Sequence, residues 1–410
     1  MDKQQLRQIV ESKRDQMVEN MMSICSVPAV NPKNGGTGEF EKTQVIMGIL
    51  DRNSIEYEIF EVPDANPNVK EGKRISVYTK IAGTKDTDKT LWFIGHTDTV
   101  SPGDLDAWDT DPFTPTKKDD GCIYGLGVED NGQAIICALQ TLLIMKEHGI
   151  QASCNVGFLF VADEECGSVF GLKPMVTQGI FGSKDEAVVP DAGSLDGSFV
   201  EIAEKSMAWV NFTVYGKQAH GSMPHLGINA HSVGCHFAVE LEDTLKETFA
   251  FKDPLFDPPY STFELTQKLA NVDSVNILPG KDCFSMDMRV LPNFKLDEVL
   301  SVVDKIIAKY EYAHKVKIEY DFTQRVDAPP PTPADSPIVQ NIVSSIKDSG
   351  VDAVYGGIGG GTCAAFLRDI GVAAVVWSTL IEMAHQPNER IIIENLVTDC
   401  YIFLLTILKY

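Results

Sequence analysis

The chain has 410 residues, of which 44% are hydrophobic and 23% are charged, so it is long enough for two or three domains with sizeable cores. Its 35 lysines and arginines against 58 acidic residues give a formal net charge of -23. A surface this acidic repels the phosphates of nucleic acids, so we expect no nucleic-acid partner.

The nine cysteines stand singly along the chain, without a paired spacing, which predicts mostly buried thiols in a reducing compartment. The first 16 residues are charged and lack the apolar core of a signal peptide. No apolar run is long enough to span a bilayer. We therefore expect a cytoplasmic protein with no membrane partner.

The first part of the sequence alternates between helix and strand patterns. Helical spacing of apolar residues predicts helices over 6–21, 35–53 and 131–149. Runs rich in β-branched and aromatic residues predict strands over 55–62, 75–83, 91–100 and 154–165. This alternation predicts an α/β domain with a mixed, largely parallel sheet between helices.

The pattern changes after about residue 191. Strand patterns at 201–217 and 282–294 flank a long helix pattern at 229–249, which is α+β in style. After a proline-rich connector at 326–337, the alternating helix and strand patterns of the first part return. We therefore predict a discontinuous domain of residues 1–200 and 318–410, interrupted by an inserted domain of residues 201–317.

A histidine and an aspartate end the strand pattern that begins at Leu91. Residues i and i+2 of a strand share a side, so His96 and Asp98 can face one another. A carboxylate that accepts the second N–H of a metal-bound imidazole fixes its tautomer and raises its basicity. A capped strand end with an ordinary polar turn explains the same pair, and the residues alone leave both interpretations open.

Two acidic segments raise the same question. Asp130 stands directly before a helix pattern, where a helix N-cap is an equally good explanation. Asp163, Glu164 and Glu165 end an apolar strand, where three adjacent carboxylates repel one another unless a cation or protons relieve them. One such glutamate can bind a metal while its neighbour deprotonates a water molecule; a solvated acidic turn is the alternative.

Asp191 and His385 follow two further apolar runs. A single histidine is most often without a special role, so His385 means little by itself. Taken together, however, the two histidines and the acids all stand at junctions between strands and loops. Side chains at the ends of strands converge at the carboxyl edge of an open α/β sheet. The set therefore predicts a metal site at that edge.

Seven motifs follow one another in the order seen in the dinuclear zinc amidohydrolases: GHTDTV, GLGVEDNG, ADEECGS, PDAG, GKQAHGSMP, GGGT and AHQPNE. From about residue 15 to the C-terminus, the chain resembles acetylornithine deacetylase, succinyl-diaminopimelate desuccinylase, carboxypeptidase G and aminoacylase. The resemblance implies a zinc-peptidase-like catalytic domain with an inserted α+β (ferredoxin-like) lid or dimerisation domain.

The resemblance also implies two Zn²⁺ ions per chain, for which Co²⁺ or Mn²⁺ can substitute, since carboxylates mixed with imidazoles suit all three. The implied ligands are His96, Asp130 and Asp191 for one ion and Asp130, Glu165 and His385 for the other, so that Asp130 bridges. Asp98 would orient the first histidine. Glu164, the acid not used as a ligand, would be the general base.

In the inserted domain, His220 of GKQAHGSMP would cross a dimer interface to help stabilise the oxyanion. Asn276 and Arg289 correspond to the binders of a substrate carboxylate, which an arginine fork fits bidentately. Gly361 and Thr362 of GGGT would close the same pocket. Without the resemblance, His220 is explained as an ordinary loop histidine, and Arg289 as a charge on the surface of a strand.

Cys363 stands where many relatives have an acid, which weakens the transfer of a particular specificity. The expected activity is hydrolysis of the amide bond of a small N-acylated amino acid, of the deacetylase or desuccinylase type in amino-acid biosynthesis. A di- or tripeptidase, or a carboxypeptidase, acting on short peptides with the same metal site is the alternative. A non-catalytic binding homologue should have lost Glu164 or a ligand. A homodimer through the inserted domain is the expected assembly.

Overall fold

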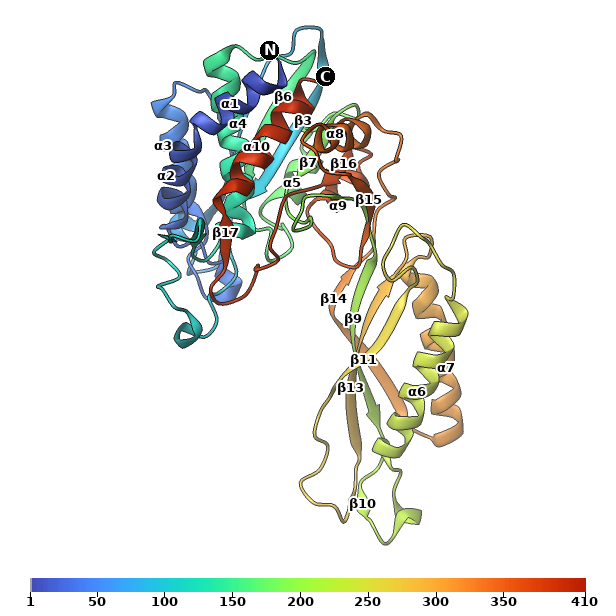
Figure 1. The fold of residues 1–410 in the computed structure, drawn as a ribbon. Coiled ribbons are helices and arrows are strands. Elements are labelled where there is room, and N and C mark those ends of the chain that lie inside the picture. Colours follow the sequence, from blue (N-terminus) through green and yellow to red (C-terminus); the bar gives the residue numbers. More distant parts are fainter. Residues whose placement is uncertain (1) are drawn as a thin grey trace. The chain divides into compact units, whose positions relative to one another are not determined.

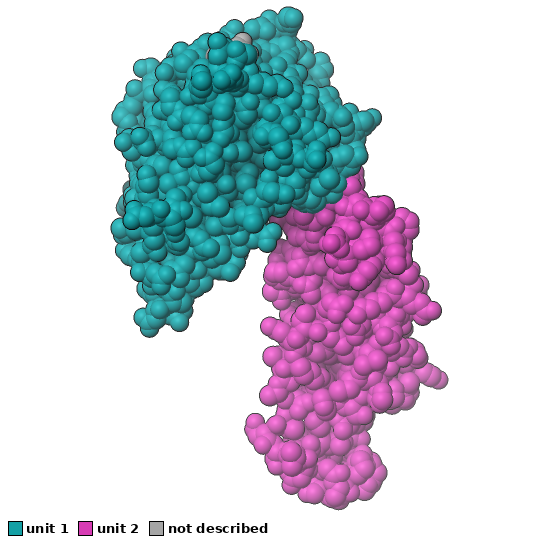
Figure 2. All heavy atoms as spheres, in the orientation of Figure 1, with its two compact units in different colours: residues 1–202, 332–356, 362–410 teal, residues 203–331, 357–361 magenta. Residues whose placement is uncertain are grey.

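The computed structural model describes residues 2–410, which divide into two compact units (Figure 2). Of these, unit 1 comprises residues 2–202, 332–356 and 362–410, and unit 2 comprises residues 203–331 and 357–361. The predicted boundary at residue 317 coincides with the start of strand β14 (Lys317–Val326), which pairs with β9 in the sheet of unit 2. Unit 2 therefore continues through this strand to Pro331.

Unit 1 is built around a mixed sheet with the strand order β1-β2-β6-β3-β7-β16-β8-β15 (Figure 1). In this order its strands are β1 (Glu58–Pro63), β2 (Lys73–Ile81), β6 (Cys154–Val161), β3 (Asp86–His96), β7 (Glu186–Val189), β16 (Ala373–Val376), β8 (Phe199–Glu204) and β15 (Val354–Ile358). The four strands from β6 to β16 are parallel to one another, and the pairs β1–β2, β2–β6 and β16–β8 are antiparallel. The predicted α/β class with a mixed sheet is confirmed.

Helices cover both faces of this sheet, because its central strands are apolar on both sides. Trp92 and Ile94 of β3 belong to a buried cluster that includes residues of α5 and α9. Phe93, which points to the opposite face, lies 4.7 Å between ring centroids from Phe403 of α10. The helices of unit 1 are α1 (Lys3–Ser12), α2 (Arg14–Cys25), α3 (Phe40–Arg52), α4 (Ala134–His148), α5 (Leu172–Thr177), α8 (Pro337–Asp348), α9 (Ala364–Asp369) and α10 (Ile393–Ile407).

Two glycines are required by this packing. Gly157 of β6 pairs in register with Trp92, and a Cβ atom on it would lie 2.4 Å from Cε3 of that indole. Gly149 ends α4 as predicted, with a φ of 63°, a left-handed conformation that glycine adopts without steric cost. A small sheet of β17 (Arg390–Ile392), β5 (Cys122–Tyr124) and β4 (Thr116–Lys117) completes unit 1.

Unit 2 has the order β9, α6, β11, β13, α7 and β14, and its antiparallel sheet runs β11-β13-β9-β14. This βαββαβ arrangement is ferredoxin-like, as predicted. Its elements are β9 (Ser206–Tyr215), α6 (Ala230–Thr248), β11 (Thr262–Lys268), β13 (Lys281–Val290) and α7 (Leu296–His314), with the short pair β10 (Ala219–His220) and β12 (Ile277–Leu278) beside them.

Both helices of unit 2 lie on the same face of its sheet (Figure 1), where the rings of Phe212, Phe237 and Phe284 contact one another in the core. Alternating residues of β9 are buried there, as expected for a sheet covered on one side. Across residues 2–410, no helix combines the length and the apolar character that crossing a membrane requires.

Candidate metal centre

The predicted ligands lie in unit 1, close to the carboxyl ends of its parallel strands. His96 ends β3, Glu165 follows β6 and Asp191 follows β7. His385 lies in the loop after β16, and Asp130 lies in the turn that precedes α4. Five residues that are far apart in the sequence are thus brought to one edge of the sheet, where α/β proteins commonly hold their sites.

Asp130 lies between the two histidines. Its Oδ1 is 2.8 Å from Nε2 of His96, and its Oδ2 is 3.0 Å from Nε2 of His385. Oδ1 of Asp191 is 3.4 Å from the first imidazole, and Oε2 of Glu165 is 3.2 Å from the second. The Asp130 carboxylate therefore contacts both imidazoles, with Asp191 beside the first and Glu165 beside the second.

The negative charge of the carboxylates in this cluster favours a bound cation. Candidate ligand atoms of His96, Asp130 and Glu165 lie within 4.8 Å of one another, as do those of His96, Glu164 and Asp191. Burial, together with the charge of Asp191, raises the pKa of Glu164 well above its usual range, and burial also raises the pKa of Glu165. Oε1 of Glu165 is buried without a hydrogen-bond partner. A donor set of carboxylates and imidazoles in this state fits a divalent metal ion.

The two imidazoles respond to the same surplus of negative charge. Burial alone would lower the pKa of His96, but the neighbouring carboxylates of Asp130, Asp191 and Asp98 raise it well above its ordinary value. Hydrogen bonds with Asp130 and Glu165 raise the pKa of His385 to about 10. Without a metal, protons on the imidazoles supply the positive charge that these carboxylates favour.

Asp98 contacts His96 differently from the prediction. Nδ1 of His96 lies 3.0 Å from the backbone oxygen of Asp98, whereas the carboxylate oxygen is 3.6 Å away. Because a carbonyl oxygen only accepts, Nδ1 is the donor, and Nε2 of the neutral ring is left with its lone pair. The Asp98 carboxylate instead accepts the backbone N–H groups of Glu164 at 2.9 Å and Glu165 at 3.3 Å.

Only two of the three consecutive acids are near the cluster. The Asp163 side chain is fully buried, and its Oδ1 lies 2.9 Å from Nδ2 of Asn31 and 3.3 Å from Nη1 of Arg74. Its Oδ2 accepts the backbone N–H of Phe170 at 3.0 Å. The repulsion expected among adjacent carboxylates is thus relieved in part by an arginine, and Asp163 is a structural residue rather than a second candidate base.

Two glutamates that were not predicted from the sequence connect the loops of the site. Glu129 accepts the backbone N–H groups of Ile381, at 2.6 Å, and Met383, in the loop that carries His385. Glu389, just beyond that loop, accepts three backbone N–H groups of the Asp130 turn at 2.8–3.0 Å, and burial raises its pKa to about 8. We refer to these hydrogen bonds as the Glu129–Glu389 clasp. Both residues stand inside quoted motifs, which was the available signal.

The remaining predicted residues fall mainly in unit 2. His220 ends β10, and the backbone N–H of Gly221 donates to the backbone oxygen of Asn276 at 2.7 Å, so these two predicted residues lie on neighbouring segments. Gly361 belongs to unit 2, whereas Thr362 begins the last segment of unit 1.

Arg289 of β13 is already paired within unit 2. Its Nε and Nη2 donate to Asp287 at 2.7 and 3.1 Å, and its Nη1 donates to the backbone oxygen of Gly359 at 2.8 Å. These contacts use three of the five N–H donors of the guanidinium. In unit 1, Cys363 is buried in the cluster around α9.

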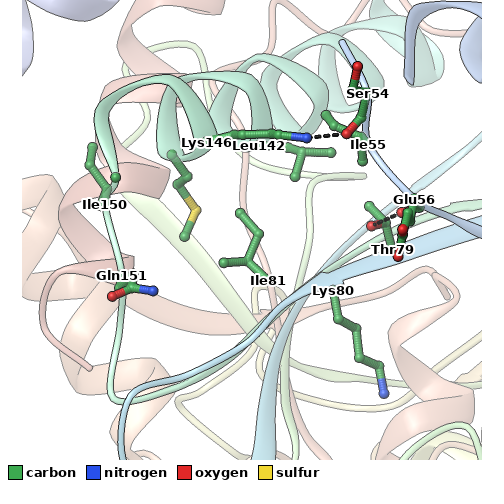
Figure 3. Close-up of a pocket in the computed structure, with 12 residues that line it drawn as sticks. Ser54, Ile55, Glu56, Thr79, Lys80, Ile81, Leu142, Lys146, Ile150 and Gln151 are labelled. Atoms are coloured by element: carbon green, nitrogen blue, oxygen red, sulfur yellow. Dashed lines mark hydrogen bonds between the residues drawn. The ribbon is translucent and has the colours of Figure 1, made fainter. Parts of the chain in front are cut away.

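A hollow of about 450 Å³ lies elsewhere in unit 1 (Figure 3). It is lined by Leu142 and Lys146 of α4, by Ile81 of β2, and by residues 54–56 between α3 and β1. These residues lie toward the far end of α4, whose 15 residues rise about 22 Å in total from the turn that carries Asp130. The hollow is therefore separate from the candidate metal centre.

The fold and the cluster define the class of protein, a metallohydrolase. The sequence model of "Peptidase family M20/M25/M40" matches residues 92–409. The chain belongs to this family, as the seven motifs predicted.

Known proteins resemble the chain over nearly its whole length. An uncharacterized metallohydrolase of Methanococcus maripaludis is 37% identical over 410 residues, which cover 95% of this chain and 98% of the relative. A succinyl-diaminopimelate desuccinylase of Wolbachia pipientis is 25% identical over 384 residues, which cover 92% and 89%. The crystal structure of aminopeptidase PepT from Bacillus cereus has a TM-score of 0.75 at 19% identity, covering 96% of this chain and 98% of that one; this likeness concerns the fold.

Proposed function

We propose that the protein hydrolyses the amide bond of a small N-acylated amino acid, as a deacetylase or desuccinylase. The observation that carries the proposal is the Asp130 carboxylate between two imidazoles, with Glu164 beside the same cluster. The similarity to a desuccinylase over 92% of the chain supports the acyl-amino-acid class. A peptidase acting on short peptides with the same centre is the alternative that the substrate panel below tests.

The residues of the centre would hold two divalent ions, which we propose to be Zn²⁺, with Co²⁺ or Mn²⁺ as substitutes. The proposed ligands are His96, Asp130 and Asp191 for one ion and Asp130, Glu165 and His385 for the other. When bound, the ions supply acidification of a water molecule and polarisation of the scissile carbonyl. The lone pair on Nε2 of neutral His96 suits this role, because its Nδ1 donates to a backbone oxygen.

Glu164 would act as the general base. It takes a proton from the attacking water and later delivers it to the leaving amine. Burial raises the pKa of Glu164 in the metal-free chain, and bound cations would favour the ionised form that the first step needs. The hydrogen bond from its backbone N–H to Asp98 fixes the point from which the side chain extends.

Unit 2 would supply the remaining donors. The backbone N–H and the hydroxyl of Ser222 lie 3.2 and 2.8 Å from Nδ1 of His220, so the neutral ring carries its proton on Nε2 and can donate to an oxyanion. We propose that this histidine serves the site of a second copy of the chain in a homodimer. Asn276 and the two unused N–H groups of Arg289 would bind the substrate carboxylate, and Gly361 and Thr362 would close the same pocket.

A first experiment combines metal analysis with a hydrolysis panel of N-acetyl amino acids, N-succinyl amino acids and dipeptides. Glu164→Gln should lower the turnover by about 10²–10⁴-fold and retain both metals. Glu165→Gln is the matched control, because it removes a ligand and should instead lower the metal content. Near-normal turnover of Glu164→Gln would refute the base, and a chain that binds no divalent metal would refute the centre.

A second experiment tests the shared site. Co-expression of His220→Ala with Glu164→Gln should restore part of the activity, because one site in each mixed dimer then has an intact base and an intact partner histidine. Each variant expressed alone is the control. Inactive mixed dimers, or a fully active monomer, would show that His220 does not act across subunits.

A further inference from the structure

A buried amide lies directly beneath the candidate metal centre. Nδ2 of Asn31 donates to Oδ2 of Asp98 at 2.8 Å and to Oδ1 of Asp163 at 2.9 Å. Its Oδ1 accepts the backbone N–H of Lys33 at 3.1 Å. Because a backbone N–H can only donate, this contact fixes the orientation of the amide, and both of its N–H donors face carboxylates.

The backbone holds Asn31 in this position. Val30 forms a parallel bridge with Thr99, in the segment just after β3. The Asn31 N–H donates to the backbone oxygen of Thr99 at 2.9 Å, and the Thr99 N–H donates to that of Ala29 at 3.0 Å. The side chain of Asn31 has no exposed surface, so it has no solvent into which it could turn.

The Asp98 carboxylate connects Asn31 to the backbone of Glu164 and Glu165. It accepts one N–H of Asn31 and also the backbone N–H groups of Glu164 and Glu165. Asp98 and Asp163 are both fully buried, and a buried carboxylate is stable only where donors compensate it. Asn31 is the neutral donor that the two carboxylates share.

We propose that Asn31 is a positioning residue of the hydrolytic reaction. It fixes the Asp98 carboxylate and thereby the backbone from which the general base and its ligand neighbour extend. The amide itself contacts neither group. This inference rests on the proposed role of Glu164.

The test measures kcat and KM separately for Asn31→Ala and Asn31→Ser, with the substrate that the hydrolysis panel identifies. Direct partners of metal ligands typically contribute about 10–100-fold to activity. Asn31 acts one residue further away, through Asp98, so we expect kcat to fall by about 10-fold, the lower end of that range. KM and metal content should stay close to those of the parent, whereas the melting temperature should fall by a few degrees, because two buried carboxylates lose a donor. Asn395→Ala is the matched control, because the Asn395 amide donates only to the backbone oxygen of Thr379 in the same unit; its kcat should not change.

A double-mutant cycle separates positioning from general damage. If Asn31 acts through Glu164, then Asn31→Ala should add little to the loss already caused by Glu164→Gln. Fully additive losses, an unchanged kcat, or a fall in kcat that merely follows a loss of metal would overturn the inference. Should Asn31→Ala fail to fold, the same cycle is run with Asn31→Ser, which keeps a hydroxyl donor. Normal turnover of Glu164→Gln alone would refute the proposed function instead.

Discussion

Replacing Arg74 with methionine should destabilise unit 1 by about 3–5 kcal/mol, the usual cost of breaking a buried ion pair. The Arg74 side chain is 2% exposed and lies 2.5 Å from the fully buried carboxylate of Glu39 and 3.3 Å from that of Asp163. Burial would lower the pKa of Arg74, but these carboxylates raise it, so the arginine stays charged. Methionine replaces the unbranched stem of the arginine side chain but carries no charge, so both carboxylates lose their cation.

The assay is urea unfolding followed by tryptophan fluorescence in a Trp209→Phe background. Trp209 is the one tryptophan of unit 2 among four in the chain, so the remaining signal reports on unit 1. Adding Glu39→Leu to Arg74→Met should recover part of the loss, because one of the two carboxylates is then removed while Asp163 still lacks its cation. A single variant that costs less than about 1 kcal/mol, or a double variant no more stable than Arg74→Met, would refute this reasoning.

Further expectations concern packing, metal and pH. Gly157→Ala should cost about 1–3 kcal/mol in the same assay, because its methyl group would overlap the indole of Trp92; an unchanged midpoint would contradict this packing. Zn²⁺ at 100 times its dissociation constant should stabilise the protein by about 2.7 kcal/mol, and a chelator should abolish both this gain and the activity. In the metal-free protein, Asp130 and Glu165 raise the pKa of His385 to about 10. A pKa that is raised in the folded state contributes stability that is lost as the pH rises. Thermal scans of the metal-free protein should therefore show a melting temperature that falls between a pH of about 6.5 and a pH of about 10. The metal-bound protein should show a smaller loss over this range.

The site residues that the sequence predicted best are polar residues at the ends of apolar strand patterns or before helix patterns. His96 ends an apolar strand and Asp130 precedes a helix, and both lie in the cluster at the carboxyl edge of the sheet. Residues that support the cluster without belonging to it, such as Asn31, do not stand at the end of a predicted strand or helix. Asn31 lies 67 residues from Asp98 and follows no periodic pattern, so only the fold brings the two together. The contact of Asp98 through its backbone oxygen depends on the path of a loop, which strand alternation does not determine.

The boundary between the units was harder to predict for a related reason. The strand pattern of β14 is compatible with either unit, and only its pairing with β9 assigns it to unit 2. Strand partners that are distant in sequence depend on tertiary packing rather than on local propensity. The individual roles of the acids came from the resemblance, because spacing alone does not distinguish a ligand from a base.

The Glu129–Glu389 clasp has a consequence for how the chain is assembled during translation. Glu389 leaves the ribosome 259 residues after Asp130, and residues 203–331 of unit 2 are synthesised in between. Because domains generally fold as units while synthesis proceeds, unit 2 can form its core while the Asp130 turn still lacks its acceptor. The turn then closes on a segment that emerges after residues 203–331, so a nascent chain cannot complete the candidate metal centre before this part of unit 2 has been synthesised.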